Sequence, residues 1–326
     1  MRPDLYLTRR SVLQNAIGSA IAGFALLRSA RPAALALPSF PGNGDPPFLV
    51  DPAWLKQALT NPAMSVRVLD SSPLRTYKHA HIPGAVHAWW QDTMDQNKEV
   101  YGSVIRPGGE QPDGTFDQSP RSQILEDLGI DDQSFVVAYD DDWGRWAAHL
   151  VWFLRFLGHD NAAVLEGGLD VWRSASFDVD SGEVKPPGVA PPTIAPRDGY
   201  FVETRQFEDL LATAGTALVD VRTLSETKDD LNGSLPLGRI PGAISFPWSE
   251  AFADDQGHLL PAADISAKLA ALGISLDRAV VLYARFGVEA GHTWLVLKLL
   301  GFPNVTIYDW GWAYWASDPA NAITPL

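Results

Sequence analysis

Residues 280–290 read Val-Val-Leu-Tyr-Ala-Arg-Phe-Gly-Val-Glu-Ala, and this stretch decides the fold. The apolar run at its start predicts a buried strand, and Gly287 permits a tight turn before a helix. Ala284, the first residue after the strand, has no lone pair and offers no nucleophile. The segment therefore predicts a buried strand, a tight loop and the start of a helix, with no reactive group at Ala284.

The same pattern occurs earlier in the chain, where residues 136–139 read Val-Val-Ala-Tyr and are followed by Asp140. Three further pairs of segments recur in the same order: His81–Ala85 with Arg239–Ala243, Leu125–Ile130 with Leu269–Ile274, and Gly158–Asn161 with Gly301–Asn304. Ordered recurrence of this kind indicates a duplicated structural unit. The chain is long enough for two domains.

Each unit alternates short apolar runs with segments of helical period. The runs that predict strands are Val66–Leu69, Phe135–Ala138, Ala163–Leu165, Ala217–Val221, Ala279–Leu282 and Thr306–Ile307. Helices are expected over Ala147–Phe156 and Glu289–Leu300. This alternation predicts an α/β fold, in which each unit is a parallel sheet flanked by helices.

The expected domains are residues 47–184 and 197–326, separated by the proline-rich segment 185–196. Proline lacks an N–H donor, so this segment is expected to be a semi-rigid linker. The first unit also carries an insertion, roughly Asp92–Phe116, that is rich in glycine and polar residues. Two interpretations of it stay open: a lid-like surface loop and a structureless excursion.

The first 36 residues resemble a twin-arginine export signal. Residues 8–13 read Thr-Arg-Arg-Ser-Val-Leu, a weakly apolar run follows, and Ala34-Leu35-Ala36 supplies a cleavage site. The alternative interpretations are a membrane anchor and a chance pair of arginines, and the apolar run is too short and too weakly apolar to span a bilayer stably. We therefore expect export to the periplasm or secretion.

Composition limits the partners. The chain has a formal net charge of −14, which argues against nucleic acid and anionic membranes. It contains no cysteine, which is compatible with an oxidising compartment. No cofactor motif is visible, no histidine cluster has metal-ligand spacing, and the sequence reveals no protein partner.

These motifs resemble the tandem-domain rhodanese family of sulfurtransferases, whose active loop reads Tyr-Cys-Arg-x-Gly. Further matching segments are Leu218–Arg222, the two Ile-Pro-Gly-Ala segments, His292–Trp294, Tyr308-Asp309 and Leu165–Leu169. In the family a cysteine persulfide carries the sulfur, and Ala284 stands at the position of that cysteine. The resemblance implies the fold, whereas the persulfide mechanism is not available to this chain.

The resemblance also implies which residues line the anion site: Arg285, Phe286, Gly287, Val288, Glu289 and Ala290. Phe286 stands where thiosulfate-preferring members often have lysine, and Glu226 stands where many members have arginine. Glu289 adds a further negative charge. Two interpretations stay open, a pocket for a small oxyanion or sulfur compound and a vestigial loop kept for packing.

Whether the chain is an enzyme also stays open. One alternative is a thiosulfate or 3-mercaptopyruvate sulfurtransferase, present as a Cys→Ala variant or working by other chemistry. Asp220 and Arg222 resemble the family's buried ion pair that braces the active loop. Trp310 departs from the family pattern. The favoured interpretation of its aromatic segment is core and domain-interface packing, and the alternative is that Trp310 reshapes the pocket mouth toward an apolar ligand. His81 is expected to make a bracing hydrogen bond.

The first unit has its own loop, residues 139–146. Family members usually have an inactive first domain, often with Asp at the cysteine position, and Asp140 conforms to this. Three adjacent carboxylates raise the hypothesis of a calcium site, but their spacing matches no known calcium loop. The favoured interpretation is that they cap the next helix, with Asp141 within reach of Arg145.

Overall fold

The computed structural model describes residues 46–89, 119–202, 204–213, 215–228, 235–252, 257–308 and 310–326. The expected export segment, residues 1–36, and the insertion Asp92–Phe116 lie outside these residues. Within the described ranges, no helix combines the length and the apolar character needed to cross a membrane.

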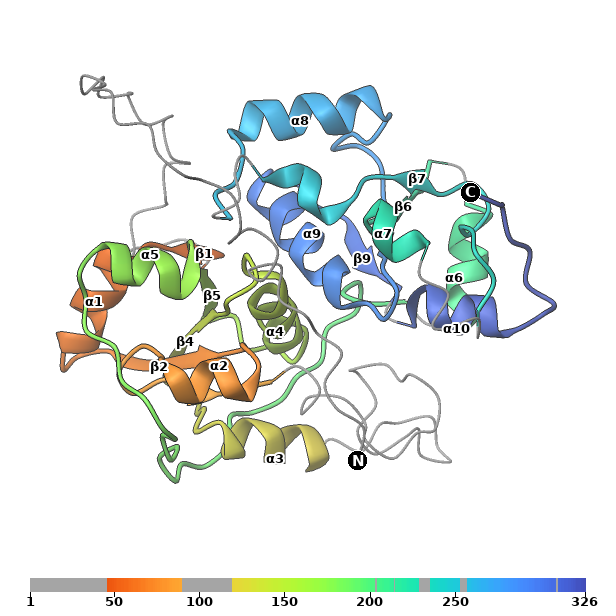
Figure 1. Ribbon diagram of the computed structural model, residues 1–326. Coiled ribbons are helices and arrows are strands. Elements are labelled where there is room, and N and C mark those ends of the chain that lie inside the picture. The colour runs from red at the N-terminus through yellow and green to blue at the C-terminus, as the bar shows by residue number, and fades with distance from the viewer. Residues whose placement is uncertain are drawn as a thin grey trace, which may run out of the picture. The chain divides into compact units, whose positions relative to one another are not determined.

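The first repeat is a five-stranded parallel sheet in the order β1-β5-β4-β2-β3 (Figure 1). Its strands are β1 (Leu49–Val50), β2 (Ser65–Asp70), β3 (Val86–His87), β4 (Ser134–Tyr139) and β5 (Ala162–Leu165). Its helices are α1 (Pro52–Thr60), α2 (Leu74–His79), α3 (Ser119–Asp127), α4 (Arg145–Phe156) and α5 (Gly168–Ser174).

The second repeat has a four-stranded parallel sheet in the order β7-β6-β8-β9. Its strands are β6 (Ala217–Asp220), β7 (Ile244–Ser245), β8 (Val280–Tyr283) and β9 (Val305–Ile307). Its helices are α6 (Thr204–Leu211), α7 (Leu224–Thr227), the 3-10 helix η3 (Trp248–Ala251), α8 (Ala262–Ala271), α9 (Val288–Leu299) and α10 (Gly311–Ser317). A single parallel bridge between Phe201 and Ile307 takes the place that β1 has in the first repeat. The predicted duplicated α/β fold is confirmed.

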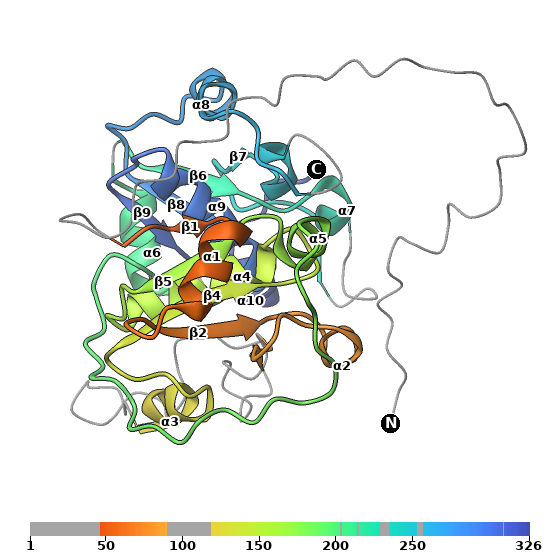
Figure 2. The same cartoon turned by 90° about the vertical axis from the view of Figure 1, so that its left-hand side faces the viewer.

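Side chains from alternate positions of each strand enter different hydrophobic clusters, as the period of a strand requires. On the first sheet, α1 and α5 pack with Val137 and its neighbours, whereas α4 packs with Val136 and Ala138 on the other face. On the second sheet, α6 and α10 cover one face, and α8 and α9 cover the other. The cluster that holds α4 also holds α9, so one continuous core joins the two repeats. Figure 2 shows α1 and α5 in front of the first sheet.

The recurring Ile-Pro-Gly-Ala segment forms the same turn in both repeats. The N–H of Ala85 donates to the carbonyl of Ile82 at 2.9 Å, and Ala243 donates to Ile240 at 3.1 Å. The glycine of each segment has φ of 78°, a conformation that glycine adopts without strain. The turn is held to the sheet by the tyrosine that ends the central strand. Tyr139 Oη accepts from the N–H of Ile82 at 2.9 Å, and Tyr283 makes the equivalent bond in the second repeat.

The linker, residues 185–196, contains no helix or strand and is anchored to the first repeat. The N–H of Thr193 donates to Asp132 Oδ1 at 2.9 Å, and the N–H of Ala195 donates to the carbonyl of Leu157 at 2.9 Å. Proline removes donors at several positions of the segment, so the remaining N–H groups carry the anchoring.

Candidate functional site

Loop two, which we define as residues 284–290, connects β8 to α9 and is tightly braced. Gly287 forms the N-cap of α9 with φ of 85°. Ala284 is fully buried, and its carbonyl accepts from the N–H of Trp312 at 2.8 Å. The next carbonyl, that of Arg285, accepts from Ala313 at 3.0 Å. A side chain at Gly311 would lie 2.6 Å from both of these carbonyl oxygens, so only glycine permits the close approach of α10.

Loop one, defined as residues 140–147, follows β4 in the first repeat and is the counterpart of loop two. The carboxylate of Asp140 accepts hydrogen bonds from four backbone N–H groups, those of Asp142 (2.7 Å), Gly144 (2.8 Å), Trp146 (2.8 Å) and Ala147 (2.9 Å). The side chain is 3 % exposed. Burial raises the pKa of Asp140 to about 7, while its N–H donors act in the opposite direction. Loop one is thus an N–H cradle filled by the chain's own carboxylate.

The two loops share their backbone conformation at the helix start but differ in the residue that follows the strand. Each ends at a glycine N-cap in the left-handed conformation, Gly144 in loop one and Gly287 in loop two. The N–H groups of Gly287 and Ala290 occupy the positions of two Asp140 donors, yet neither has an acceptor among the described residues. Ala284 supplies no oxygen. Loop two therefore presents N–H donors that an external anion can satisfy.

Arg145, the first residue of α4, links the first repeat to loop two. Its Nη1 lies 3.6 Å from Glu226 Oε1 and 3.6 Å from Glu289 Oε1, both of the second repeat. Its Nη2 also pairs with Asp142. The expectation that Asp141 pairs with Arg145 is therefore wrong, because the loop brings the carboxylate three residues before the helix start to the guanidinium. Sequence reasoning missed the reach of Arg145 into the second repeat.

The guanidinium of Arg145 lies against two indole rings. Its Cζ is 4.1 Å from the ring centroid of Trp146 and 5.1 Å from that of Trp248. Such stacking orients a planar guanidinium and stabilises its charge. The side chain is 16 % exposed, so Arg145 is a partly buried cation at the entrance of loop two.

Glu289, the second residue of α9, lies beside this cation with 13 % of its side chain exposed. Burial raises the pKa of Glu289, and the nearby Glu226 raises it further, while Arg145 and Arg285 lower it. Its Oε2 has no hydrogen-bond partner among the described residues. Arg285 itself donates from Nη2 to the carbonyl of Glu226 at 2.8 Å, which fixes α7 to the loop. The site therefore combines arginines with carboxylates and is less positive than the family pattern implies.

The remaining wall of the site is aromatic. His292 lies one helical turn beyond Val288, and its ring is 4.8 Å from Phe252 and 5.8 Å from Trp248. Burial lowers the pKa of His292 to about 3, so the imidazole is neutral near pH 7. It is a packing group in this site and not a second cation.

Asp220 and Arg222 form a fully buried ion pair after β6. Arg222 donates from Nε to Asp220 Oδ1 at 2.9 Å and from Nη2 to Oδ2 at 2.7 Å. The guanidinium also donates to the carbonyl of Gly238 and lies 4.6 Å from the ring centroid of Trp312. The backbone N–H of Trp312 donates to the carbonyl of Ala284. The ion pair therefore supports α10, the helix that braces loop two.

Other predicted residues lie as follows. Nδ1 of His81 is 2.9 Å from the carbonyl oxygen of Tyr77, and the two rings stack. Phe286 is half-buried, and the ring of Trp310 lies 4.6 Å from that of Tyr314. No group of carboxylates and histidines within the described ranges has the geometry of a metal site. Both carboxylate oxygens of Asp140 accept hydrogen bonds from backbone N–H groups.

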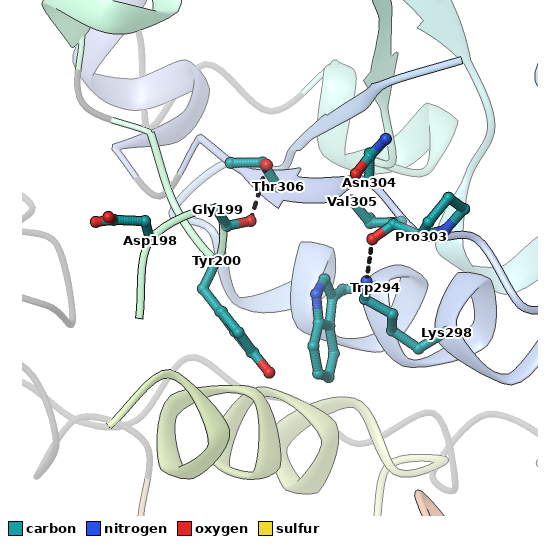
Figure 3. Close-up of a pocket in the computed structure, with 9 residues that line it drawn as sticks. All are labelled: Asp198, Gly199, Tyr200, Trp294, Lys298, Pro303, Asn304, Val305 and Thr306. Atoms are coloured by element: carbon teal, nitrogen blue, oxygen red, sulfur yellow. Dashed lines mark hydrogen bonds between the residues drawn. The ribbon is translucent and has the colours of Figure 1, made fainter. Parts of the chain in front are cut away.

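A cavity of about 230 Å³ lies away from loop two, where β9 begins (Figure 3). Tyr200 and Trp294 line it, and Lys298 at its edge donates to the carbonyl of Pro303 at 2.7 Å. Parallel strands start and end at opposite edges of their sheet, so this cavity does not belong to the site after β8.

Comparison with known proteins identifies the fold family. The rhodanese-like domain family matches residues 51–175 and 203–318. The chain is 30% identical over 292 residues to the sulfur carrier protein TtuD of Thermus thermophilus, covering 85% of this chain and 96% of that one. It is 31% identical over 293 residues to a thiosulfate sulfurtransferase of Corynebacterium glutamicum, covering 86% and 91%.

Among solved structures, the 3-mercaptopyruvate sulfotransferase SseA of Escherichia coli matches with a TM-score of 0.69 at 22% identity, covering 81% of this chain and 98% of that one. At this identity the likeness concerns the fold alone. The absence of cysteine agrees with replacement of the family's catalytic residue at Ala284. The chain therefore belongs to the rhodanese family and carries two rhodanese-like domains in tandem.

Proposed function

We propose that this protein is an exported rhodanese-like protein that does not transfer sulfur and binds a small oxyanion or sulfur compound at loop two. The observation that carries the proposal is the carboxylate of Asp140, which four N–H groups hold in loop one. Loop two repeats that frame with Ala284 in place of the carboxylate. An external carboxylate, sulfonate or sulfate then takes the part that Asp140 plays in the first repeat.

Loss of sulfur transfer follows from the chemistry of loop two. A persulfide needs a thiolate, and an alanine methyl group cannot attack or carry sulfur. Glu226 and Glu289 lie beside Arg145, so the charge pattern has also changed. The relatives named as sulfur carrier and thiosulfate sulfurtransferase favour a sulfur oxyanion as the ligand. Export is proposed from the arginine pair, Arg9 and Arg10, and from the cleavage-site pattern.

The second candidate, a sulfurtransferase in the form of a Cys→Ala variant, is separated from the first by an activity assay. We expect no transfer from thiosulfate or 3-mercaptopyruvate to cyanide above background by the natural chain. Ala284→Cys is expected to gain transfer, because the N–H donors of loop two stabilise a thiolate. Turnover by the natural, cysteine-free chain would contradict the proposal. If Ala284→Cys stays inactive, the negative charges of Glu226 and Glu289 prevent sulfur transfer even when a thiol is present.

Anion binding is tested by thermal unfolding with added sodium sulfate and thiosulfate, with chloride at equal ionic strength as reference. A ligand at 100 times its Kd stabilises the folded state by about 2.7 kcal/mol, so Tm rises by several degrees. Ala284→Asp supplies loop two with its own carboxylate, as in loop one, and is expected to abolish the rise. Ala284→Gly is the matched control, since it adds no acceptor and keeps the response. A sulfate response that persists in Ala284→Asp refutes binding at loop two.

A further inference from the structure

We infer that the oxyanion site is shared between the repeats, with Arg145 of the first repeat and the carboxylic acid of Glu289 both binding the anion, and that Glu289 takes up a proton when the anion binds. The inference rests on the proposed function and deepens it, because it assigns the residues that face the ligand and the linkage to protons. Its ligands are oxyanions with at least two unprotonated oxygens, such as sulfate, sulfonates and carboxylates.

Arg145 keeps donors for a ligand although carboxylates surround it. Its Nη1 is 3.6 Å from both Glu226 Oε1 and Glu289 Oε1, which is beyond ordinary hydrogen-bond distance. Its Nε is buried and has no acceptor among the described residues. Trp146 and Trp248 hold the plane of the guanidinium. Nη2 is taken by Asp142, so Nη1 and Nε are the donors left for a ligand. Planar guanidinium donors of this kind bind oxyanions well in proteins.

Glu289, whose Oε1 lies 3.6 Å from Arg145 Nη1, has a second oxygen that is unsatisfied among the described residues. It lies in the first turn of α9, where the N–H groups of loop two gather, and its Oε2 is buried without a partner in the described ranges. An ionised carboxylate has only acceptors and would oppose an anion, whereas a neutral carboxyl has one O–H donor. Protonated Glu289 therefore donates to an oxyanion that Arg145 also binds.

The charged and titratable groups around Glu289 come from several elements. Arg145 faces it from α4, Glu226 from α7 and Arg285 from the loop, and neutral His292 lies on its own helix. Burial and Glu226 already raise the pKa of Glu289 above its ordinary value. A bound anion adds a further negative charge nearby and raises the pKa again. By linkage, the proton then strengthens anion binding by the same factor.

The affinity for the anion is therefore expected to fall as the pH rises. Below the pKa that Glu289 has in the free protein, the residue is neutral before and after binding, and affinity is constant. Above that pKa, binding must bring a proton with it, so affinity falls about tenfold per pH unit. The fall ends above the higher pKa of the complex, where the anion binds to ionised Glu289.

The test is isothermal titration of the full chain with sulfate, an anion that does not itself titrate between about pH 5 and pH 9. Titrations in two buffers of different ionisation heat are expected to show uptake approaching one proton. Glu289→Gln is expected to remove both the uptake and the pH dependence, and to bind at least about tenfold more tightly than the natural chain at high pH. Glu208→Gln, an exposed carboxylate on α6, is the matched control and changes neither quantity.

Arg145→Met tests the contribution of the first repeat. We expect sulfate affinity to fall at least about tenfold at every pH, with Arg145→Lys recovering only part of it because lysine lacks the planar fork. Equal affinity in Arg145→Met overturns the shared site. Sulfate binding by the natural chain without proton uptake overturns the role of Glu289, and this needs no variant to fold. In both cases a response abolished by Ala284→Asp leaves the proposed function standing, whereas no sulfate binding at any pH refutes both.

Discussion

Arg222→Met is expected to lower the free energy of unfolding by about 4 kcal/mol, because it leaves the buried charge of Asp220 with only the partly exposed Arg239, at 3.6 Å, as a cationic partner. Arg222 and Asp220 are 1% and 0% exposed in their side chains. The substitution removes two hydrogen bonds to that carboxylate and one to the carbonyl of Gly238. It also removes the guanidinium from the ring of Trp312, whose backbone N–H donates to the carbonyl of Ala284. Urea denaturation measures the loss.

Two further variants separate this effect from the loss of any arginine. Arg197→Met breaks an exposed bidentate pair with Asp160, and it is expected to change stability by less than about 1 kcal/mol. The double variant Asp220→Leu with Arg222→Met removes both charges and is expected to be more stable than Arg222→Met alone. If the free energy of unfolding of Arg222→Met lies within about 1 kcal/mol of that of the natural chain, the ion pair is not the main stabilising contact of this region.

Gly291→Val is expected to destabilise the protein by about 3 kcal/mol, because it separates the two helices that join the repeats. A Cβ atom at Gly291 would lie 2.6 Å from His149 Cα and 3.0 Å from its backbone nitrogen. These are backbone atoms of α4, so no side-chain rotation relieves the contact. Both helices belong to the same hydrophobic cluster, which resists their separation. Urea denaturation measures the loss of stability.

The substitution also tests the site. Moving α4 away from α9 moves Arg145 away from Glu289, so sulfate affinity is expected to fall in Gly291→Val. Gly188→Val is the matched control, because Gly188 lies in the linker with nothing within 4 Å of an added Cβ. A Gly291→Val protein with natural stability would show that the helices adjust without loss.

The sequence predicted most of the fold because its signals are local. The strand expected over Val66–Leu69 is Ser65–Asp70 in the structure, and the helix expected over Ala147–Phe156 is Arg145–Phe156. A short, mostly apolar run predicts the strand and an amphipathic segment predicts the helix, and duplication gives each signal twice. The helix start was missed by two residues, because Arg145 and Trp146 are outside the apolar period and the left-handed Gly144 sets the boundary.

Part of the candidate site was equally local. Ala284 and Asp140 occupy matching places directly after a strand, so their chemistry was readable from neighbouring residues. The pairing of Asp220 with Arg222 was expected from the resemblance to the family, and the structure contains the pair. The partner of Arg145 was wrongly predicted as Asp141, since the choice between adjacent carboxylates depends on the path of the loop and not on spacing.

By itself the sequence determined a duplicated α/β chain with a strand–loop–helix segment that lacks a nucleophile at Ala284. Only the tertiary structure decided which groups close that loop. Arg145 reaches Glu226 and Glu289 because α4 and α9 pack backbone to backbone at Gly291, and the indole of Trp248 then lies over the guanidinium. No periodicity encodes contacts between residues so far apart in the sequence. It arises because both helices bury their apolar faces in one shared core.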